Sequence, residues 1–153
     1  MFSHVNKVGK AIMVNIINKT NTNRTAKASA DIIVPSHVYN AVIDNTVKKG
    51  DVTFVSRLAG IIAAKNTYQV IPLCHPINID HVDINIIEHP PNRFEIIAEV
   101  AIFNKTGVEM EALHAATIAS LTFYDMCKAL SKDIIITNVH LISKTGGKSD
   151  YNL

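Results

Sequence analysis

Apolar residues alternate with polar ones, or run together between turn residues, in four stretches of the chain. Such stretches predict strands, because successive side chains of a strand point to opposite faces of a sheet. The predicted strands span residues 26–34, 81–88, 93–103 and 134–142. Four residues separate the second from the third, and their turn sequence Pro90-Pro91-Asn92 predicts a hairpin.

Apolar residues recur at helical spacing in two other stretches, and a third helix is predicted from a capping motif followed by a run without proline. Ser36 and Asp51 are expected to cap the first two helices, since their side-chain oxygens can accept hydrogen bonds from free backbone N–H groups. Thr106 and Glu109 have the spacing of a capping box, a hydroxyl followed three residues later by a carboxylate. This pair predicts the start of a long helix that ends near Leu130.

With the two early helices counted as one layer, the order of elements is strand, helix, strand, strand, helix, strand. This order predicts an α+β fold, a ferredoxin-like sandwich in which helices cover one face of an antiparallel sheet. Six isoleucines cannot all point inward: Ile77, Ile79, Ile86, Ile87, Ile96 and Ile97. We therefore expect the other face of the sheet to be buried against another subunit.

Length and composition agree with one folded domain. A chain of 153 residues, of which 48% are hydrophobic, can bury a core, and this excludes a disordered protein. We expect residues 1–25 to form an N-terminal arm or loop, residues 26–149 a single domain and residues 150–153 a C-terminal tail.

Charge balance and cysteine count narrow the class of protein. The formal net charge of +2 does not favour nucleic-acid binding, and two cysteines are too few for a secreted disulfide scaffold. No apolar run reaches the ~18 residues of a membrane span. The first ten residues contain no secretory signal. We expect a cytoplasmic protein without a membrane or nucleic-acid partner.

Two groups of residues are candidates for proton transfer. His75 lies between two prolines, so its backbone is stiff and its ring direction is fixed, as an acid/base group requires. Asp125 and Lys128 are neighbours on one helix face. Asp125 lies late in its helix among apolar residues, where burial would raise its pKa and the lysine would oppose that shift. Such coupled pairs are candidates for proton transfer.

Each candidate also has a structural interpretation. His75 fits a structural histidine, and Lys49, beside a glycine, fits a solvated turn residue. Glu109 fits the capping-box carboxylate, and Glu111 fits a first-turn carboxylate that favours the helix dipole. Exposed on a helix surface, Asp125 and its lysine would form only a weak ion pair.

Two binding motifs are not supported. A zinc site built from Cys74, His75 and Cys127 lacks the close Cys-x-x-Cys pair of structural zinc sites. Gly147-Lys148-Ser149 resembles the end of a P-loop, but Ile142 stands where that motif needs glycine and no helix follows. Its glycines still allow the backbone to approach a phosphate.

Between residues 24 and 149, six short strings of residues occur in the order and at the spacing of one known family. They are Lys49-Gly50-Asp51, Ala59-Gly60-Ile61 with Ala63-Ala64-Lys65, Ile71-Pro72-Leu73-Cys74-His75-Pro76, Lys105-Thr106-Gly107-Val108-Glu109-Met110-Glu111-Ala112-Leu113, Tyr124-Asp125-Met126-Cys127-Lys128-Ala129 and Lys144-Thr145-Gly146-Gly147-Lys148-Ser149. Together they resemble the MoaC family, the cyclic pyranopterin monophosphate synthases of molybdenum cofactor biosynthesis. The chain departs from the family's usual pattern in two places: Val14-Asn15-Ile16-Ile17 stands for the usual Val-Asp-Val-Ser, and Asp150 for a final glycine.

The resemblance implies a lyase that converts 3′,8-cyclo-7,8-dihydroguanosine 5′-triphosphate into cyclic pyranopterin monophosphate and pyrophosphate. The family uses no organic cofactor, and no protein-bound metal is expected; whether Mg²⁺ accompanies the triphosphate stays open. The family's acid/base aspartate falls on Asp125 and its catalytic lysines on Lys49 and Lys128. Its substrate-contacting segments fall on Leu73-Cys74-His75 and Met110-Glu111, with Glu109 close by. The family forms dimers that assemble into hexamers.

Fixed cations would stabilise the negative charge that grows on the departing pyrophosphate. The available cations are Lys49, Lys65, Lys128, Lys144, Lys148 and Arg24. Glu111 and Asp125 are about 21 Å apart on one continuous helix. We therefore expect each active site to combine residues from two chains of a homo-oligomer.

Two rival functions fit the sequence less well. A ferredoxin-like RNA-binding module would show paired aromatic residues on a central strand, yet aromatic content is only 6%. A catalytically dead assembly subunit is disfavoured because the chain retains four candidate catalytic residues: Lys49, His75, Asp125 and Lys128.

Overall fold

The computed structural model describes residues 5, 6 and 8–153. Five strands and four helices follow one another along the chain. In order they are β1 (Thr22–Ile33), α1 (Ser36–Ile43), α2 (Val52–Lys65), α3 (Thr67–Val70), β2 (His81–His89), β3 (Arg93–Asn104), α4 (Glu109–Cys127), β4 (Ile135–Thr145) and β5 (Tyr151–Asn152). None of the helices in the described part of the chain is both long and apolar enough to cross a bilayer.

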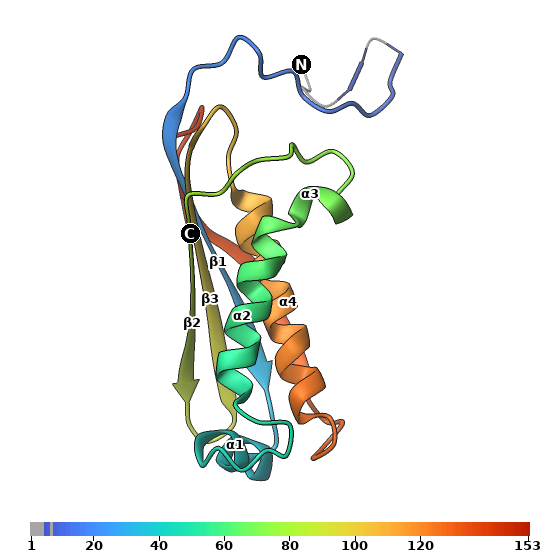
Figure 1. Ribbon diagram of the computed structural model, residues 1–153, viewed down its shortest axis with the longest axis vertical. Coiled ribbons are helices and arrows are strands. Elements are labelled where there is room, and N and C mark those ends of the chain that lie inside the picture. Colours follow the sequence, from blue (N-terminus) through green and yellow to red (C-terminus); the bar gives the residue numbers. More distant parts are fainter. Residues whose placement is uncertain (1–4, 7) are drawn as a thin grey trace.

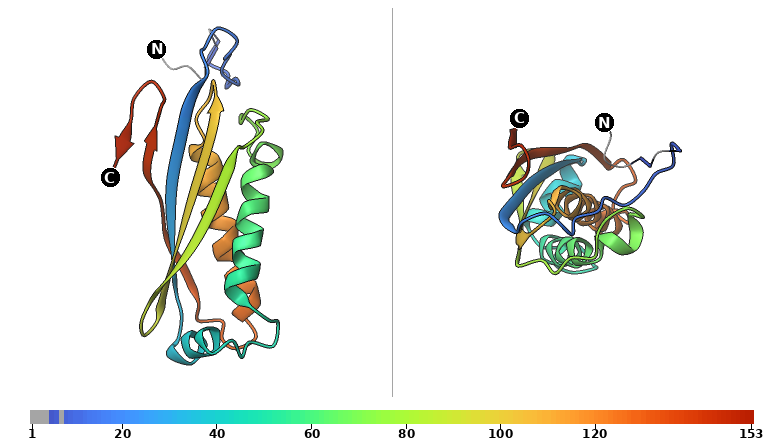
Figure 2. Two further views of the ribbon diagram at one scale, coloured as in Figure 1. Left: turned by 60° about the vertical axis from the view of Figure 1, so that its left-hand side comes forward. Right: turned by 90° about the horizontal axis from the view of Figure 1, so that it is seen from above.

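The strands form one antiparallel sheet in the order β2-β3-β1-β4-β5. Helices α2 and α4 lie side by side on one face of this sheet, while α1 and α3 lie near its opposite ends (Figures 1 and 2). The structure therefore confirms the predicted α+β, ferredoxin-like architecture. Because α4 runs nearly the full length of the sheet, residues at its two ends lie in two different parts of the molecule (Figure 1).

The core lies between the sheet and the two long helices. Every second residue of β3 from Phe94 to Ile102 is buried, as the alternating pattern predicts. The buried face of α4 is rich in alanine, which lets the helix approach the sheet and α2 closely. Phe94 joins the layers at one end, with its ring centroid 4.8 Å from that of Tyr39 and 4.9 Å from that of Phe123.

Two of the three predicted helix starts differ in the structure. Asp51 caps α2 as expected, because its side chain accepts a hydrogen bond from the Phe54 N–H. Ser36 is instead the first residue of α1, and the side chains at that start make no capping hydrogen bond. The predicted capping box is also wrong. Val108 is the N-cap of α4, and the Glu109 carboxylate forms an ion pair with Lys144 of β4.

The chain ends are more ordered than their composition suggested. β1 begins at Thr22, so residues 22–25, which were expected in a loop or arm, pair with β3. β4 extends to Thr145, and Tyr151–Asn152 pair back onto it as β5. Backbone pairing with a neighbouring strand overrides the polar, non-periodic character of these residues.

The outer face of the sheet carries ion pairs. Lys27 pairs with Glu99 at 2.9 Å, and Arg93 pairs with Asp31 at 2.7 Å. Of the six isoleucines that could not all point inward, Ile96 is fully buried, and three others pack against the core, namely Ile77, Ile79 and Ile86. Ile87 remains 40% exposed. This face thus has less apolar surface in need of a second subunit than the sequence suggested.

Candidate active site

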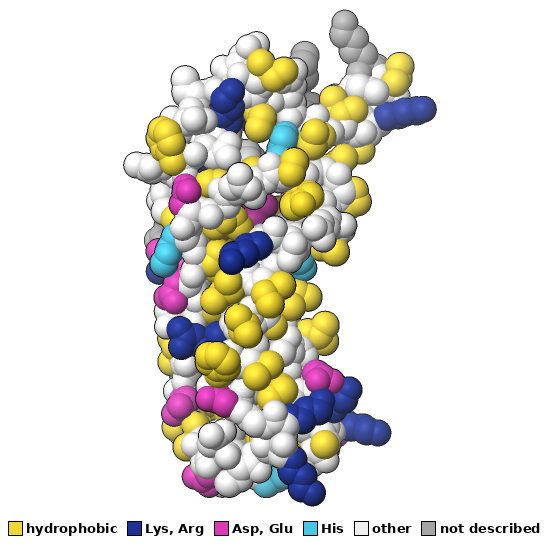
Figure 3. Space-filling model, in the orientation of Figure 1, with side chains coloured by type: hydrophobic (Ala, Val, Ile, Leu, Met, Phe, Trp, Pro, Cys, Tyr) yellow, Lys and Arg dark blue, Asp and Glu magenta, His cyan; other side chains and the backbone are white. Residues whose placement is uncertain are grey.

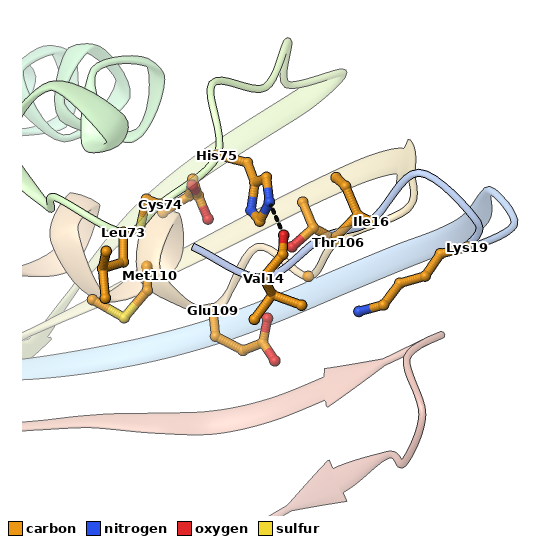
Figure 4. Close-up of a pocket in the computed structure, with 11 residues that line it drawn as sticks. Val14, Ile16, Lys19, Leu73, Cys74, His75, Thr106, Glu109 and Met110 are labelled. Atoms are coloured by element: carbon orange, nitrogen blue, oxygen red, sulfur yellow. Dashed lines mark hydrogen bonds between the residues drawn. The ribbon is translucent and has the colours of Figure 1, made fainter. Parts of the chain in front are cut away.

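A cavity of about 390 Å³ opens at the end of the sheet where α4 begins. Three segments that are far apart in the sequence line it: residues 14–19, residues 73–75 and residues 106–111. Figure 4 shows side chains from these segments arranged around it. The structure brings together here six of the expected substrate-contacting residues: Leu73, Cys74, His75, Glu109, Met110 and Glu111.

His75 makes a backbone contact at this cavity. Its Nε2 atom lies 2.7 Å from the carbonyl oxygen of Val14, as the dashed line in Figure 4 shows. A carbonyl oxygen only accepts hydrogen bonds, so Nε2 carries a proton and donates it, which leaves Nδ1 for another partner. The ring therefore ties the N-terminal segment to the cavity. The acid/base role of His75 stays a prediction.

Two glutamates at the start of α4 have different environments. Glu109 Oε1 lies 3.0 Å from Lys144 Nζ, so β4 supplies the counter-ion of a carboxylate that lines the cavity. Glu111 is only 4% exposed, and burial, together with the negative charge of Glu109, raises the pKa of its carboxyl to about 7. A carboxyl with such a pKa can exchange a proton near neutral pH.

The two cysteines are free thiols at opposite ends of α4. Cys74 lines the cavity, and Cys127 is buried at the far end of the helix. Burial raises the pKa of both thiols, that of Cys127 to about 11, so the protonated form predominates near neutral pH. Within residues 5, 6 and 8–153, no three His, Cys, Asp or Glu side chains are grouped to hold a metal ion.

A second cluster lies where α4 ends. Lys49 Nζ lies 2.7 Å from Asp125 Oδ2, and Lys128 Nζ lies 2.7 Å from Asp125 Oδ1. Lys49 also donates to the backbone carbonyl of Asp125, at 2.8 Å. The next residue, Gly50, has a φ of +101°, a left-handed conformation that turns the chain into α2 and suits glycine. Figure 3 shows basic side chains gathered around acidic atoms at this end of the molecule.

The environment of Asp125 decides between two sequence-based interpretations. The sequence left open a partly buried carboxyl with a raised pKa or an exposed ion pair, and the side chain is 53% exposed. Hydrogen bonds from Lys128 and Lys49 lower the pKa of Asp125 to about 2, and the aspartate in turn raises the pKa of Lys128. Because the side chain is exposed, desolvation opposes ionisation less than these hydrogen bonds favour it. At neutral pH the cluster is therefore one carboxylate between two ammonium groups.

The remaining predicted cations lie outside the cavity lining. Arg24 donates from Nε to the Asn104 carbonyl at 2.9 Å, in the strand pair that leads to the cavity. Lys65 is exposed at the end of α2, and Lys148 is exposed in the turn between β4 and β5. Their assignment as substrate-binding residues stays a prediction.

Five cavity residues were not predicted as site residues. Thr106 and Gly107 lie within a motif string, whereas Val14, Ile16 and Lys19 precede the first strand, in the segment expected to be an arm. A lysine in a polar, non-periodic run has no local signal of a binding role. Contacts with residues distant in sequence place this segment at the cavity: His75, 61 positions beyond Val14, and Lys105, which donates to the Ile17 carbonyl.

The structure thus contains two chemically different half-sites. The cavity supplies a buried carboxyl with a pKa near neutrality and an imidazole, and the Asp125 cluster supplies two cations and an ionised carboxylate. Within one chain, α4 keeps them apart by about 21 Å of helix between Glu111 and Asp125.

Comparison with known proteins gives one consistent result. Residues 13–147 match the model of the MoaC family. The cyclic pyranopterin monophosphate synthase of Staphylococcus haemolyticus is 47% identical over 155 residues, which cover 98% of this chain and 97% of the relative. The protein of the same name from Thermoanaerobacter sp. (strain X514) is 45% identical over 148 residues, which cover 96% and 94% of the two chains. The chain belongs to the MoaC family.

Proposed function

We propose that this chain is a cyclic pyranopterin monophosphate synthase of molybdenum cofactor biosynthesis. The proposed substrate is 3′,8-cyclo-7,8-dihydroguanosine 5′-triphosphate, and pyrophosphate is released. One structural observation carries the proposal: a single carboxylate, Asp125, holds the ammonium groups of Lys49 and Lys128, each at 2.7 Å. Such a cluster combines a proton-accepting group with two cations for a phosphate leaving group.

The cyclic phosphate step illustrates the need for both kinds of group. A substrate hydroxyl oxygen forms a bond to the α-phosphorus while the bond from that phosphorus to the pyrophosphate oxygen breaks. The hydroxyl proton goes to Asp125, to which we assign the role of base. Because the pKa of Asp125 is about 2, the carboxylate accepts this proton only while the new bond to phosphorus forms, and then releases it to water. The negative charge grows on pyrophosphate, where Lys49 and Lys128 stabilise it.

We assign the cavity at the other end of α4 to substrate binding and to further proton transfers. Opening the guanine ring and closing the pterin ring require several such transfers. Glu111, with its pKa near neutrality, suits one of them, and the Nδ1 atom of His75 suits a contact with the substrate. We propose no metal or organic cofactor for these steps.

We further propose that two chains build each site. In a symmetric dimer with antiparallel α4 helices, the Asp125 cluster of one chain lies beside the Glu111 cavity of its partner. The helix layer offers apolar surface for such contact, and Figure 3 shows this surface over the middle of the molecule. Its most exposed members are Phe54 (63%), Leu58 (48%), Ile62 (52%) and Leu121 (55%). Assembly of dimers into hexamers rests on the family resemblance alone.

The proposal is tested by turnover of 3′,8-cyclo-7,8-dihydroguanosine 5′-triphosphate, with the product detected by fluorescence after oxidation of the pterin. The purified chain should form the product, and Asp125→Asn should lose at least about 100-fold in rate. Asp125 is exposed, so the variant should keep its thermal unfolding midpoint. The matched control is Asp133→Asn, which removes an exposed carboxylate just after α4 and should keep full activity. A fully active Asp125→Asn variant would refute the assigned role.

A further inference from the structure

A strap formed by residues 14–19 crosses the cavity before β1 begins. Two long-range hydrogen bonds hold it, and both go to its backbone: His75 Nε2 contacts the Val14 carbonyl at 2.7 Å, and Lys105 Nζ donates to the Ile17 carbonyl at 2.8 Å. Between these points the strap is folded on itself, because the Asn15 side chain accepts from the Ile17 N–H. Two residues outside the strap, His75 and Lys105, therefore fix its path.

The strap brings one charged side chain to the cavity, that of Lys19. Figure 4 shows its ammonium group directed toward the Glu109 side of the cavity. Among the described residues, Glu109 pairs with Lys144, and no carboxylate lies within ion-pair distance of Lys19. A cation at a cavity wall without a protein counter-ion is suited to an anionic ligand group.

We propose that Lys19 binds a phosphate group of the substrate, and that Lys105 is a positioning residue that acts through Lys19. This inference rests on the proposed function, because the substrate is then a nucleoside triphosphate derivative. Lys105 directs its ammonium group to the strap backbone and does not line the cavity. Loss of its hydrogen bond frees the strap and lowers the fraction of molecules in which Lys19 faces the cavity. The apparent affinity for the substrate falls by the same factor as this fraction.

Steady-state kinetics of a double-mutant cycle test the proposal. Lys19→Met should raise KM about tenfold or more with little change in kcat, because a contact present in both ground and transition states affects binding only. Lys105→Met should also raise KM, and Lys105→Arg should restore it, since a guanidinium can donate to the same carbonyl. Once Lys19 is absent, Lys105→Met should add less than about twofold, because residues that act through one another are not additive.

Lys10→Met is the matched control, because it removes a lysine of the same N-terminal segment that does not line the cavity. An unchanged KM in Lys19→Met, or independent effects of the two lysines, would overturn the proposal. Binding of GTP, measured by calorimetry, separates this outcome from failure of the proposed function. If the chain makes no pterin product but Lys19→Met weakens GTP binding, the phosphate contact stands. If the unchanged chain neither turns over substrate nor binds GTP, both proposals fail.

Discussion

Glu111 and Asp125 lie on the same helix, α4, but at opposite ends, about 21 Å apart. The two carboxyls also have opposite electrostatic environments. Burial raises the pKa of Glu111 to about 7, and two lysines lower the pKa of Asp125 to about 2. Near neutral pH, Glu111 at one end of the helix can therefore gain or lose a proton, whereas Asp125 at the other end stays ionised.

Mixed dimers test whether these two ends serve one site. Glu111→Ala and Asp125→Asn subunits should each be inactive alone. After verified subunit exchange, a heterodimer should recover up to one intact site, because one partner supplies each missing group. Activity of the mixture is compared with that of each variant treated in the same way. No recovery would show that each chain holds a complete site.

The two lysines that contact Asp125 should affect the rate more than substrate binding. Lys49→Met and Lys128→Met should each lower kcat by about 100-fold or more, because cations aimed at a leaving group act in the transition state. Lys148→Met, in the exposed turn before β5, should mainly raise KM. If Lys148→Met lowered only kcat, this division of roles would be wrong.

Because of Glu111, the free energy of unfolding should decrease as pH rises. Its pKa is about 7 in the folded chain against 4.5 for an ordinary glutamate, so the folded state binds more protons than the unfolded state in that interval. The free energy of unfolding should therefore fall as pH rises from about 4.5 to 7, by up to about 1.4 kcal/mol per pH unit. Urea denaturation at several pH values should show that Glu111→Gln removes this decrease. Equal slopes in both proteins would contradict the assignment.

Gly60 should tolerate no branched side chain. A Cβ atom there would lie 3.1 Å from the Ala115 carbonyl oxygen and 3.2 Å from both Ala119 Cβ and Ile84 Cδ1. Gly60→Val forces α2 away from α4 and should lower the free energy of unfolding by about 1–3 kcal/mol. Chemical denaturation measures this change. Ala59→Val, at the neighbouring and partly exposed position, is the control and should cost less.

The local pattern of the sequence was sufficient for most of the fold. Alternation in β3, the proline-free run of α4 and the Asp51 cap are properties of residues close in sequence, and the strand, the helix and the cap were each predicted correctly. The motif strings likewise indicated the family, which the comparisons show. Element order then left few arrangements besides a ferredoxin-like sheet.

Tertiary structure decided the features that depend on distant partners. Glu109 contacts Lys144 of β4, so the expected capping box does not form. Lys49, 76 positions before Asp125, helps to keep that carboxyl ionised, and the fold leaves the carboxyl exposed. The strap is placed by His75, 61 positions beyond Val14. Local sequence determines which conformations a segment prefers, but the charge state of a side chain depends on which groups the fold brings within a few ångströms of it.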